Sequence, residues 1–242
     1  MPLTPPAPSR PLRDYAAIGD GRTVALIGLD GGVDWLPLPN IHSRPVFARL
    51  VDESAGGCIQ LAPVEEYEVT RRYIPRTNVL ETTFTTPSGV ATLTDAMVTG
   101  IAGRLPWAEL ARRVDGVKGE VEFAWCVQPG TMLRSAAPWT ERIDGFSIMR
   151  IGHVSLAVTG HEHGLHGDPD AGNESIDGGF TTEKGSRHLL VIAAVEGEPL
   201  RVPDAQNVDR GIDRTIGGWE MWSDEFSYDG PWADDVQRSA LA

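Results

Sequence analysis

Short apolar runs recur from residue 23 to residue 195, and clusters of glycine, proline, aspartate and asparagine separate them. Such runs are too short for most helices, and turn residues at this spacing are typical of antiparallel sheets. The alternation is clearest over residues 121–127, where Val, Phe, Trp and Val occupy every second position. The pattern predicts an all-β fold in which two antiparallel sheets pack face to face.

The strongest turn signal is Asp30-Gly31-Gly32, which lies between the first two apolar runs. An Asp-Gly pair tolerates the positive φ that a tight hairpin requires. The strands expected from the runs are residues 23–29, 33–36, 58–61, 67–73, 79–86, 90–97, 109–114, 121–127, 146–151, 154–158, 179–182 and 188–195.

Helices are expected in three places only. Ser43 is a suitable N-cap for a short helix over residues 44–51. Apolar residues at helical intervals predict a C-terminal linker helix over residues 208–222, although Gly217 and Gly218 weaken it. A further helix is expected to begin after Pro231. The predicted fold is therefore a β-supersandwich with one short helix near 44–51 and a C-terminal linker helix.

Composition and charge narrow the possible partners. With 27 glycines, 18 prolines, 41% hydrophobic and 23% charged residues, the chain suits a turn-rich globular protein rather than a helical bundle. A net charge of −13 disfavours binding to nucleic acid, because a basic excess is needed to displace counterions from phosphates. Residues 1–13 are rich in proline and have no apolar core, so we expect an extended lead rather than a signal peptide or membrane anchor.

The two cysteines, Cys58 and Cys126, stand in strand-like surroundings and lack the spacing of a metal clip. Buried free thiols are favoured over a disulfide, and free thiols are typical of a cytoplasmic protein. A cluster of histidines with one carboxylate, over residues 161–166, has the residue types of a metal site. Because it lies in a polar, glycine-rich stretch, we favour a solvated loop over residues 161–178 and expect no metal or other cofactor.

One block of motifs has a recognisable order. It begins with Ile-Gly-Asp-Gly-Arg-Thr at 18–23 and continues with Asp-Gly at 30–31, Val-Asp-Trp at 33–35, a proline turn at 37–39, Ser-x-x-x-Phe at 43–47 and Gly-Gly at 56–57. Later matches include Arg-Tyr at 72–73, Thr-Asn-Val-Leu-Glu-Thr at 77–82, the strand at 89–95 and the segment 219–239. The combination resembles the N-terminal, trehalase-like domain of bacterial proteins in glycoside hydrolase family 15.

The resemblance implies a sandwich over residues 14–205 and, over 206–242, a linker helix followed by the truncated start of an (α/α)6-barrel. In that family the barrel carries two catalytic glutamates, which act as the acid and base of inverting hydrolysis. We therefore expect no catalytic residue in this chain and no hydrolytic activity from it alone. The implied partner is the catalytic barrel of the same parent chain.

The end of the second predicted strand and the loop after it hold the candidates for a sugar-facing rim: Trp35, Asn40, His42 and Arg44. An indole face suits the C–H surface of a sugar, and the neighbouring polar groups offer hydrogen bonds on a loop braced by proline. The simpler alternative is that Trp35 belongs to the core. The chain also departs from the family pattern here, because Asn-Ile-His-Ser at 40–43 replaces the usual Arg-Phe-Asp-Ser.

Tryptophans dominate the candidate docking face, which is expected around Trp107, Trp219, Trp222 and Trp232. Glu220 stands between two of them and is the most attractive isolated acid, but the helical spacing favours an interdomain seal. The predicted role is to dock and stabilise the catalytic domain of an enzyme acting on trehalose or an α-glucan. The alternative is a stand-alone carbohydrate-binding or scaffold module in which the tryptophans stack on sugar.

Overall fold

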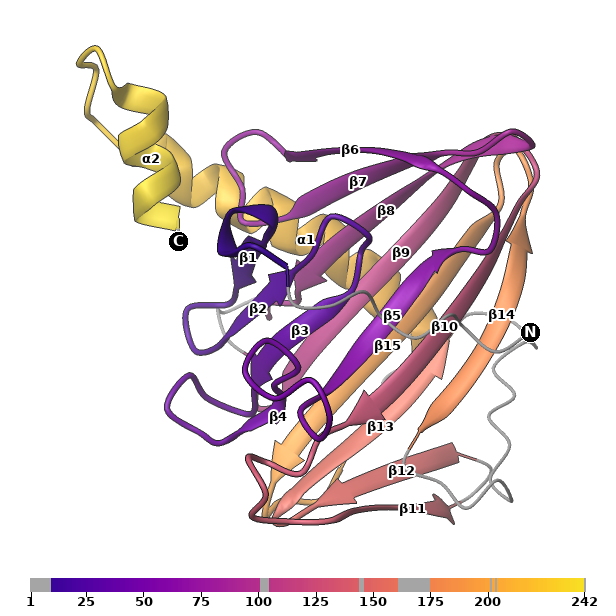
Figure 1. Cartoon of the computed structure of the whole chain (residues 1–242). Coiled ribbons are helices and arrows are strands. Elements are labelled where there is room, and N and C mark those ends of the chain that lie inside the picture. The colour runs from indigo at the N-terminus through magenta and orange to yellow at the C-terminus, as the bar shows by residue number, and fades with distance from the viewer. Residues whose placement is uncertain are drawn as a thin grey trace.

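The computed structural model describes residues 10–100, 105–143, 146–160, 175–200, 202 and 204–241. They form two antiparallel sheets that face each other (Figure 1), as the alternating pattern predicts. The seven-stranded sheet has the order β1 (Ala16–Gly19), β2 (Val24–Ile27), β3 (Val33–Pro37), β5 (Gly57–Pro63), β10 (Val121–Pro129) and β14 (Ile176–Thr182), with β4 (Pro45–Phe47) paired to β3.

The eight-stranded sheet is the larger one. Its order is β11 (Pro138–Ile143), β12 (Phe146–Ile151), β13 (Val154–Gly160), β15 (Arg187–Glu196), β9 (Ala108–Gly119), β8 (Gly89–Met97), β7 (Leu80–Thr85) and β6 (Glu68–Tyr73). Two helices follow the sheets, α1 (Ala205–Asp224) and α2 (Ala233–Leu241), and a 3-10 turn (Leu12–Asp14) precedes them. Neither helix has the length and apolar character needed to cross a bilayer, within the residues described.

Apolar side chains from the inner faces of both sheets fill the core. Trp125, Phe47, Phe84 and Phe123 are its largest apolar members, and each is at most 1% exposed. The alternation read from residues 121–127 is observed in β10, where every second side chain is buried. Because the period of a strand is two, the intervening residues face away from the core.

The hairpin signal at Asp30-Gly31-Gly32 is also confirmed. Gly31 has a φ of +78°, and the amide N–H of Gly28 donates to the carbonyl of Gly32 at 2.8 Å. The fully buried Arg112 on β9 donates to the Gly31 carbonyl and pairs with Asp95 at 2.7 Å. The hydrogen bond from Arg112 to Gly31 therefore joins the hairpin of the seven-stranded sheet to the eight-stranded sheet.

The short helix expected over residues 44–51 is wrong. Residues 45–47 form strand β4 instead, and only a turn follows, in which the N–H of Asp52 donates to the carbonyl of Ala48 at 3.0 Å. Pro45 explains the difference, because the residue before a proline is driven away from helical φ/ψ and Arg44 cannot start the first turn. The sequence prediction weighed the Ser43 cap above this restriction.

Other differences are smaller. Strands β1, β4 and β11 were not predicted, and β14 begins at Ile176, inside the stretch expected to be a loop. The histidine cluster at 161–166 lies outside the described residues. A helix is confirmed where the linker helix was expected, but it is longer than predicted, and Asp204 caps it by accepting a hydrogen bond from the N–H of Asn207 at 3.1 Å.

Helix α1 packs across the outer face of the eight-stranded sheet (Figure 1). Val208, Ile212 and Ile216 face the strands and complete a second apolar cluster with residues such as Ala111 and Val191. The outward side chains of β8, β9 and β15 are thereby covered although they lie outside the sandwich core. The helix is thus part of the folded unit and not a free tail.

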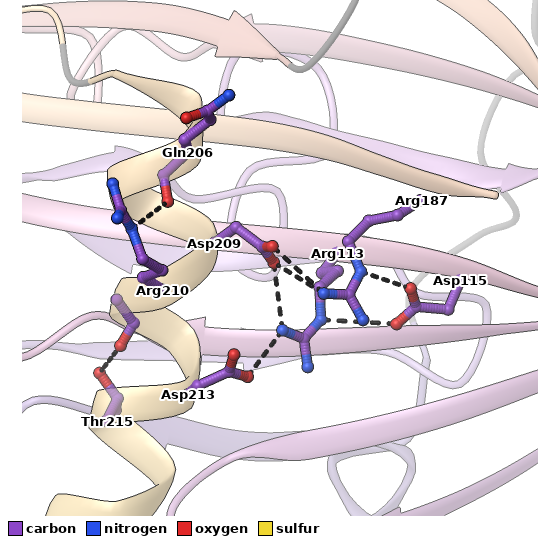
Figure 2. A network of polar contacts seen from close by, with 9 residues as sticks. Arg113, Asp115, Arg187, Gln206, Asp209, Arg210, Asp213 and Thr215 are labelled. Atoms are coloured by element: carbon purple, nitrogen blue, oxygen red, sulfur yellow. Dashed lines mark hydrogen bonds and ion pairs between the residues drawn. The ribbon is translucent and has the colours of Figure 1, made fainter. Parts of the chain in front are cut away.

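Charged side chains fasten the first half of α1 to the same face. Figure 2 shows Arg113 and Arg187, from β9 and β15, turned toward the helix. Arg113 lies 2.8 Å from Asp213 and 3.1 Å from Asp209, while Arg187 reaches Asp209 at 3.2 Å. Arg113 is mostly buried, so these pairs are less screened than ordinary surface pairs.

Candidate functional site

An open groove of about 870 Å³ lies along the second half of α1. The helix supplies one wall, and the rest of the lining includes Asp20 in the β1–β2 turn, Arg76 in the β6–β7 turn and Thr99 after β8. This volume is in the range of ligand and peptide sites. The groove therefore joins four segments that are far apart in the sequence.

Two glycines form part of the helical wall. A Cβ atom built on Gly217 or Gly218 would meet no atom of the chain within 4 Å, so both positions face open space. Glycine inside a helix costs about 1 kcal/mol relative to alanine. No contact within the described chain explains why larger residues are absent there.

Trp219 and Trp222 bring aromatic surface to the same wall. Their rings are 6.1 Å apart and meet edge to face at 85°. Trp219 is half-buried and packs against the apolar cluster beneath α1, whereas Trp222 is 42% exposed. One tryptophan therefore seals the helix to the sheet and the other presents its ring to solvent.

The charged groups of the groove mostly have partners already. Arg76 pairs with Asp224, and the Asp20 carboxylate accepts hydrogen bonds from the N–H groups of Arg22 and Thr23, both at 2.9 Å. Glu220, the acid singled out in the sequence, also lines the groove. Since the main carboxylates serve turns and ion pairs, the groove has the chemistry of a contact surface.

Exposed apolar side chains run from the groove into the segment that follows it. Met221, at the end of α1, lines the groove and is 69% exposed. Tyr228 and Trp232 in the connection are 45% and 67% exposed, and Val236 in α2 is 40% exposed. Single exposed apolar residues are ordinary, but a concentration of them in one short segment marks an interaction surface. We call α2 together with its connection to α1 the helical arm (residues 225–241).

Trp107 is placed differently from the other predicted docking residues. It is half-buried just before β9, does not line the groove, and donates a hydrogen bond from Nε1 to Oε2 of Glu109 at 2.7 Å. Burial raises the pKa of Glu109, and the bond from Trp107 opposes that shift only in part. Trp219 and Trp222 thus lie together on α1, whereas the indole of Trp107 binds a buried carboxylate.

The four rim candidates lie on β3 and the loop after it, and none of them lines the groove. Trp35 is half-buried opposite Leu26, while His42 and Arg44 are exposed. The N–H of Asn40 donates to Oγ of Ser43 at 3.3 Å, and the N–H of Ser43 returns a bond to the Asn40 carbonyl at 2.9 Å. This loop is a closed turn whose side chains point partly to solvent.

Sequence reasoning missed several residues of the groove. The sequence predicts no groove role for Asp20 or Arg76, and it indicates Gly217 and Gly218 only as residues that weaken a helix. A signal existed for the glycines, because two adjacent glycines in an amphipathic helix indicate either a kink or a close approach. No local signal brings Asp20 and Arg76 to α1, since that contact depends on the tertiary fold.

The described residues thus form a β-sandwich domain with a groove and a partly apolar helical arm at its C-terminal end. The family model described as trehalase-like, N-terminal matches residues 7–131, more than half of the chain, and the chain belongs to this family.

Curated relatives agree with that assignment. A trehalase of Mycobacterium tuberculosis is 30% identical over 275 residues, covering 99% of this chain and 38% of the relative. A trehalase of Thermoplasma volcanium is 27% identical, covering 94% of this chain and 36% of the relative, and one of Mycolicibacterium smegmatis is 27% identical over 97% and 38%. The chain spans little more than a third of the length of these relatives.

Proposed function

We propose that this chain is the non-catalytic N-terminal domain of a glycoside hydrolase of the family 15 type, acting on trehalose or another α-glucoside. Its role is to dock against the catalytic (α/α)6-barrel of the parent polypeptide and to stabilise it. Three relatives that bear the name trehalase are matched over most of this chain but over at most 38% of their own length. That difference is the observation that carries the proposal.

The surface chemistry supports a docking role. The groove beside α1 and the helical arm present Trp222, Trp232 and Met221 to solvent, each more than 40% exposed. Large apolar side chains exposed to water are unfavourable for an isolated domain. In an interface they are buried, and exposed aromatic side chains of this kind often become binding hot spots. The catalytic part of the same polypeptide is the occupant that the relatives' length favours. A cytoplasmic location remains a prediction from the two free thiols.

The activity assay comes first. Incubated with trehalose or maltose, the purified chain is expected to release no glucose, since the proposal places both catalytic glutamates in the barrel. Turnover that persists through further purification and disappears on unfolding would overturn the proposal.

Docking is tested in a polypeptide that carries this domain together with its catalytic part. Trp222→Ala and Trp232→Ala are expected to lower the unfolding temperature of that longer protein while leaving the 242-residue chain nearly unchanged. Trp139→Ala, which removes a tryptophan on β11 whose exposure lies between those of Trp222 and Trp232, is the matched control and is expected to change neither protein. Equal effects of all three substitutions in the longer protein would contradict docking through the groove and the arm.

One observation favours the alternative, a carbohydrate-binding module. Trp139 is 52% exposed on the edge strand β11, and the Arg150 guanidinium lies 5.7 Å from the centre of its ring beside Glu141. Aromatic faces flanked by charged hydrogen-bonding groups bind sugars in many proteins. Tryptophan fluorescence titrated with maltooligosaccharides separates the two proposals, because saturable binding lost in Trp139→Ala supports the module and no response supports docking.

A further inference from the structure

The β6–β7 turn, residues 74–79, is unusually well fixed for a surface turn. The N–H of Ile74 donates to the Val79 carbonyl at 2.9 Å, and the Thr77 hydroxyl donates to the Ile74 carbonyl at 2.9 Å while accepting from the N–H of Val79 at 3.1 Å. Arg76 has a φ of 61°, a conformation that non-glycine residues rarely adopt. These hydrogen bonds fix the backbone of the turn, and with it the direction of the carbonyl groups that the turn presents to its neighbours.

Two side chains hold the turn to the first strand of the other sheet. The Tyr73 hydroxyl accepts from the N–H of Ala17 at 3.0 Å and donates to its carbonyl at 2.9 Å. The Asn78 side-chain amide donates to the carbonyl of Gly19 at 3.2 Å, and Asn78 is buried. The turn is therefore held by hydrogen bonds to the seven-stranded sheet as well as by its own strands in the eight-stranded sheet.

Arg238 of α2 binds this turn in three ways. Its guanidinium carbon lies 3.7 Å from the centre of the Tyr73 ring, Nη1 donates to the Thr77 carbonyl at 2.9 Å, and Nη2 donates to Oδ1 of Asn78 at 2.7 Å. A planar guanidinium can stack and donate at the same time, whereas a lysine ammonium cannot reproduce this geometry. Leu241, one turn further along α2, is 5% exposed and closes the contact.

The end of α1 meets the same turn. The Ser223 hydroxyl donates to the Arg76 carbonyl at 2.8 Å, and Gln237 of α2 donates to the Ser223 carbonyl at 3.3 Å. Both helices are therefore joined to one turn and to each other. The segment that connects them, by contrast, carries the exposed Tyr228 and Trp232.

We infer that the β6–β7 turn is a socket that fixes the direction of α2, and that Arg238 is the positioning residue that holds the helix in it. A helix of nine residues is too short to be stable in water on its own, so its order must come from such contacts. The residues involved also explain separate motifs of the sequence: Arg-Tyr at 72–73, Thr-Asn at 77–78 and the segment 219–239 meet at this one point. The inference rests on contacts within this chain and does not depend on the proposed enzyme.

The test measures α2 directly in the 242-residue chain. In Arg238→Gln, amide hydrogen exchange of residues 234–241 is expected to accelerate at least tenfold, while exchange in β6, β7 and the first half of α1 stays as in the parent chain. Arg210→Gln is the matched control, because among the described residues Arg210 makes its hydrogen bonds within its own helix, to Gln206 and Asn207. Unchanged exchange of α2 in Arg238→Gln would overturn the inference, as would equal acceleration across all elements.

Two substitutions of Tyr73 separate the stacking contact from the link to β1. Tyr73→Phe keeps the ring face beneath Arg238 and loses the hydroxyl bonds to Ala17, so α2 is expected to remain protected. Tyr73→Leu loses both, and protection of α2 should fall toward the Arg238→Gln level. If the Phe variant released α2 as fully as the Leu variant, the ring would not be the contact that holds Arg238. The proposed function can fail separately. If α2 is protected from exchange but the domain does not dock on the catalytic part of a longer protein, only the proposed function is contradicted.

Discussion

Replacing Gly217 and Gly218 by alanine is expected to stabilise this domain. Both residues lie inside α1 and a Cβ at either site would meet nothing within 4 Å, so the substitution adds no clash. Glycine is about 0.8–1.0 kcal/mol less favourable than alanine in a helix interior, mostly through backbone entropy of the unfolded chain. The double variant should therefore gain roughly 1.6–2 kcal/mol, and at about 2–4 °C per kcal/mol for a chain of this size the unfolding temperature should rise by about 3–8 °C.

The assay is thermal and urea unfolding of the 242-residue chain, followed by circular dichroism. Gly211→Ala is the matched control, because it lies in the same helix but its Cβ would come within 3.0 Å of Val98 Cγ1. In the control, the gain in helix propensity is offset by the close contact of the new Cβ with Val98, so its free energy of unfolding should not rise. If the urea m-value is the same in the variant and the parent, both proteins expose the same amount of surface on unfolding, and their free energies of unfolding can be compared directly.

A double variant that is no more stable than the parent would refute the reasoning. It would mean that α1 unfolds separately from the sandwich or that the groove wall is not a regular helix. In a polypeptide that also carries the catalytic part, the same two methyl groups would stand in the groove. We expect docking to weaken there, so stability gained in the isolated domain would be offset in the longer protein.

Three further predictions concern the interior. Gly178→Ala should destabilise the chain by about 1–3 kcal/mol in urea unfolding, because its Cβ would lie 2.6 Å from the ring of the buried Trp125. Arg113→Gln should cost about 2 kcal/mol, since it removes charged hydrogen bonds between β9 and α1, including that to Asp213. Burial raises the folded-state pKa of Glu109, so its ionisation destabilises the folded state as the pH rises. The stability of Glu109→Gln relative to the parent chain should therefore increase between pH 4 and pH 7, as measured by urea unfolding at each pH.

The sequence predicts the sandwich well because its signals are local. Alternation over residues 121–127 predicts a strand, and the Asp30-Gly31 pair predicts a hairpin. Each signal is contained within a few adjacent residues. The error at 44–51 is also local: a good N-cap at Ser43 was weighed above the restriction that Pro45 imposes on Arg44. Short strands such as β1 and β4 escape detection because three or four residues carry too little periodicity.

The groove could be predicted only in part. Trp219 and Trp222 are found from their helical spacing, since both lie on one element. Asp20 and Arg76 reach the groove through turns more than 100 residues away in the sequence, and their positions depend on how the sheets pack. Trp107 has the composition of a docking residue, but its nitrogen is occupied by Glu109, a contact that residue type alone does not reveal.

The two sides of α1 have separable roles, which makes the proposals testable one at a time. Val208 and Ile212 are at most 2% exposed against the sheet, so changes there alter the fold of the domain itself. Gly217, Gly218 and Trp222 lie on the wall that faces the groove and contribute little to that packing. A substitution on the groove side that changes the longer protein but not this chain can therefore be assigned to docking, because the contacts that fold the domain lie on the other side of the helix.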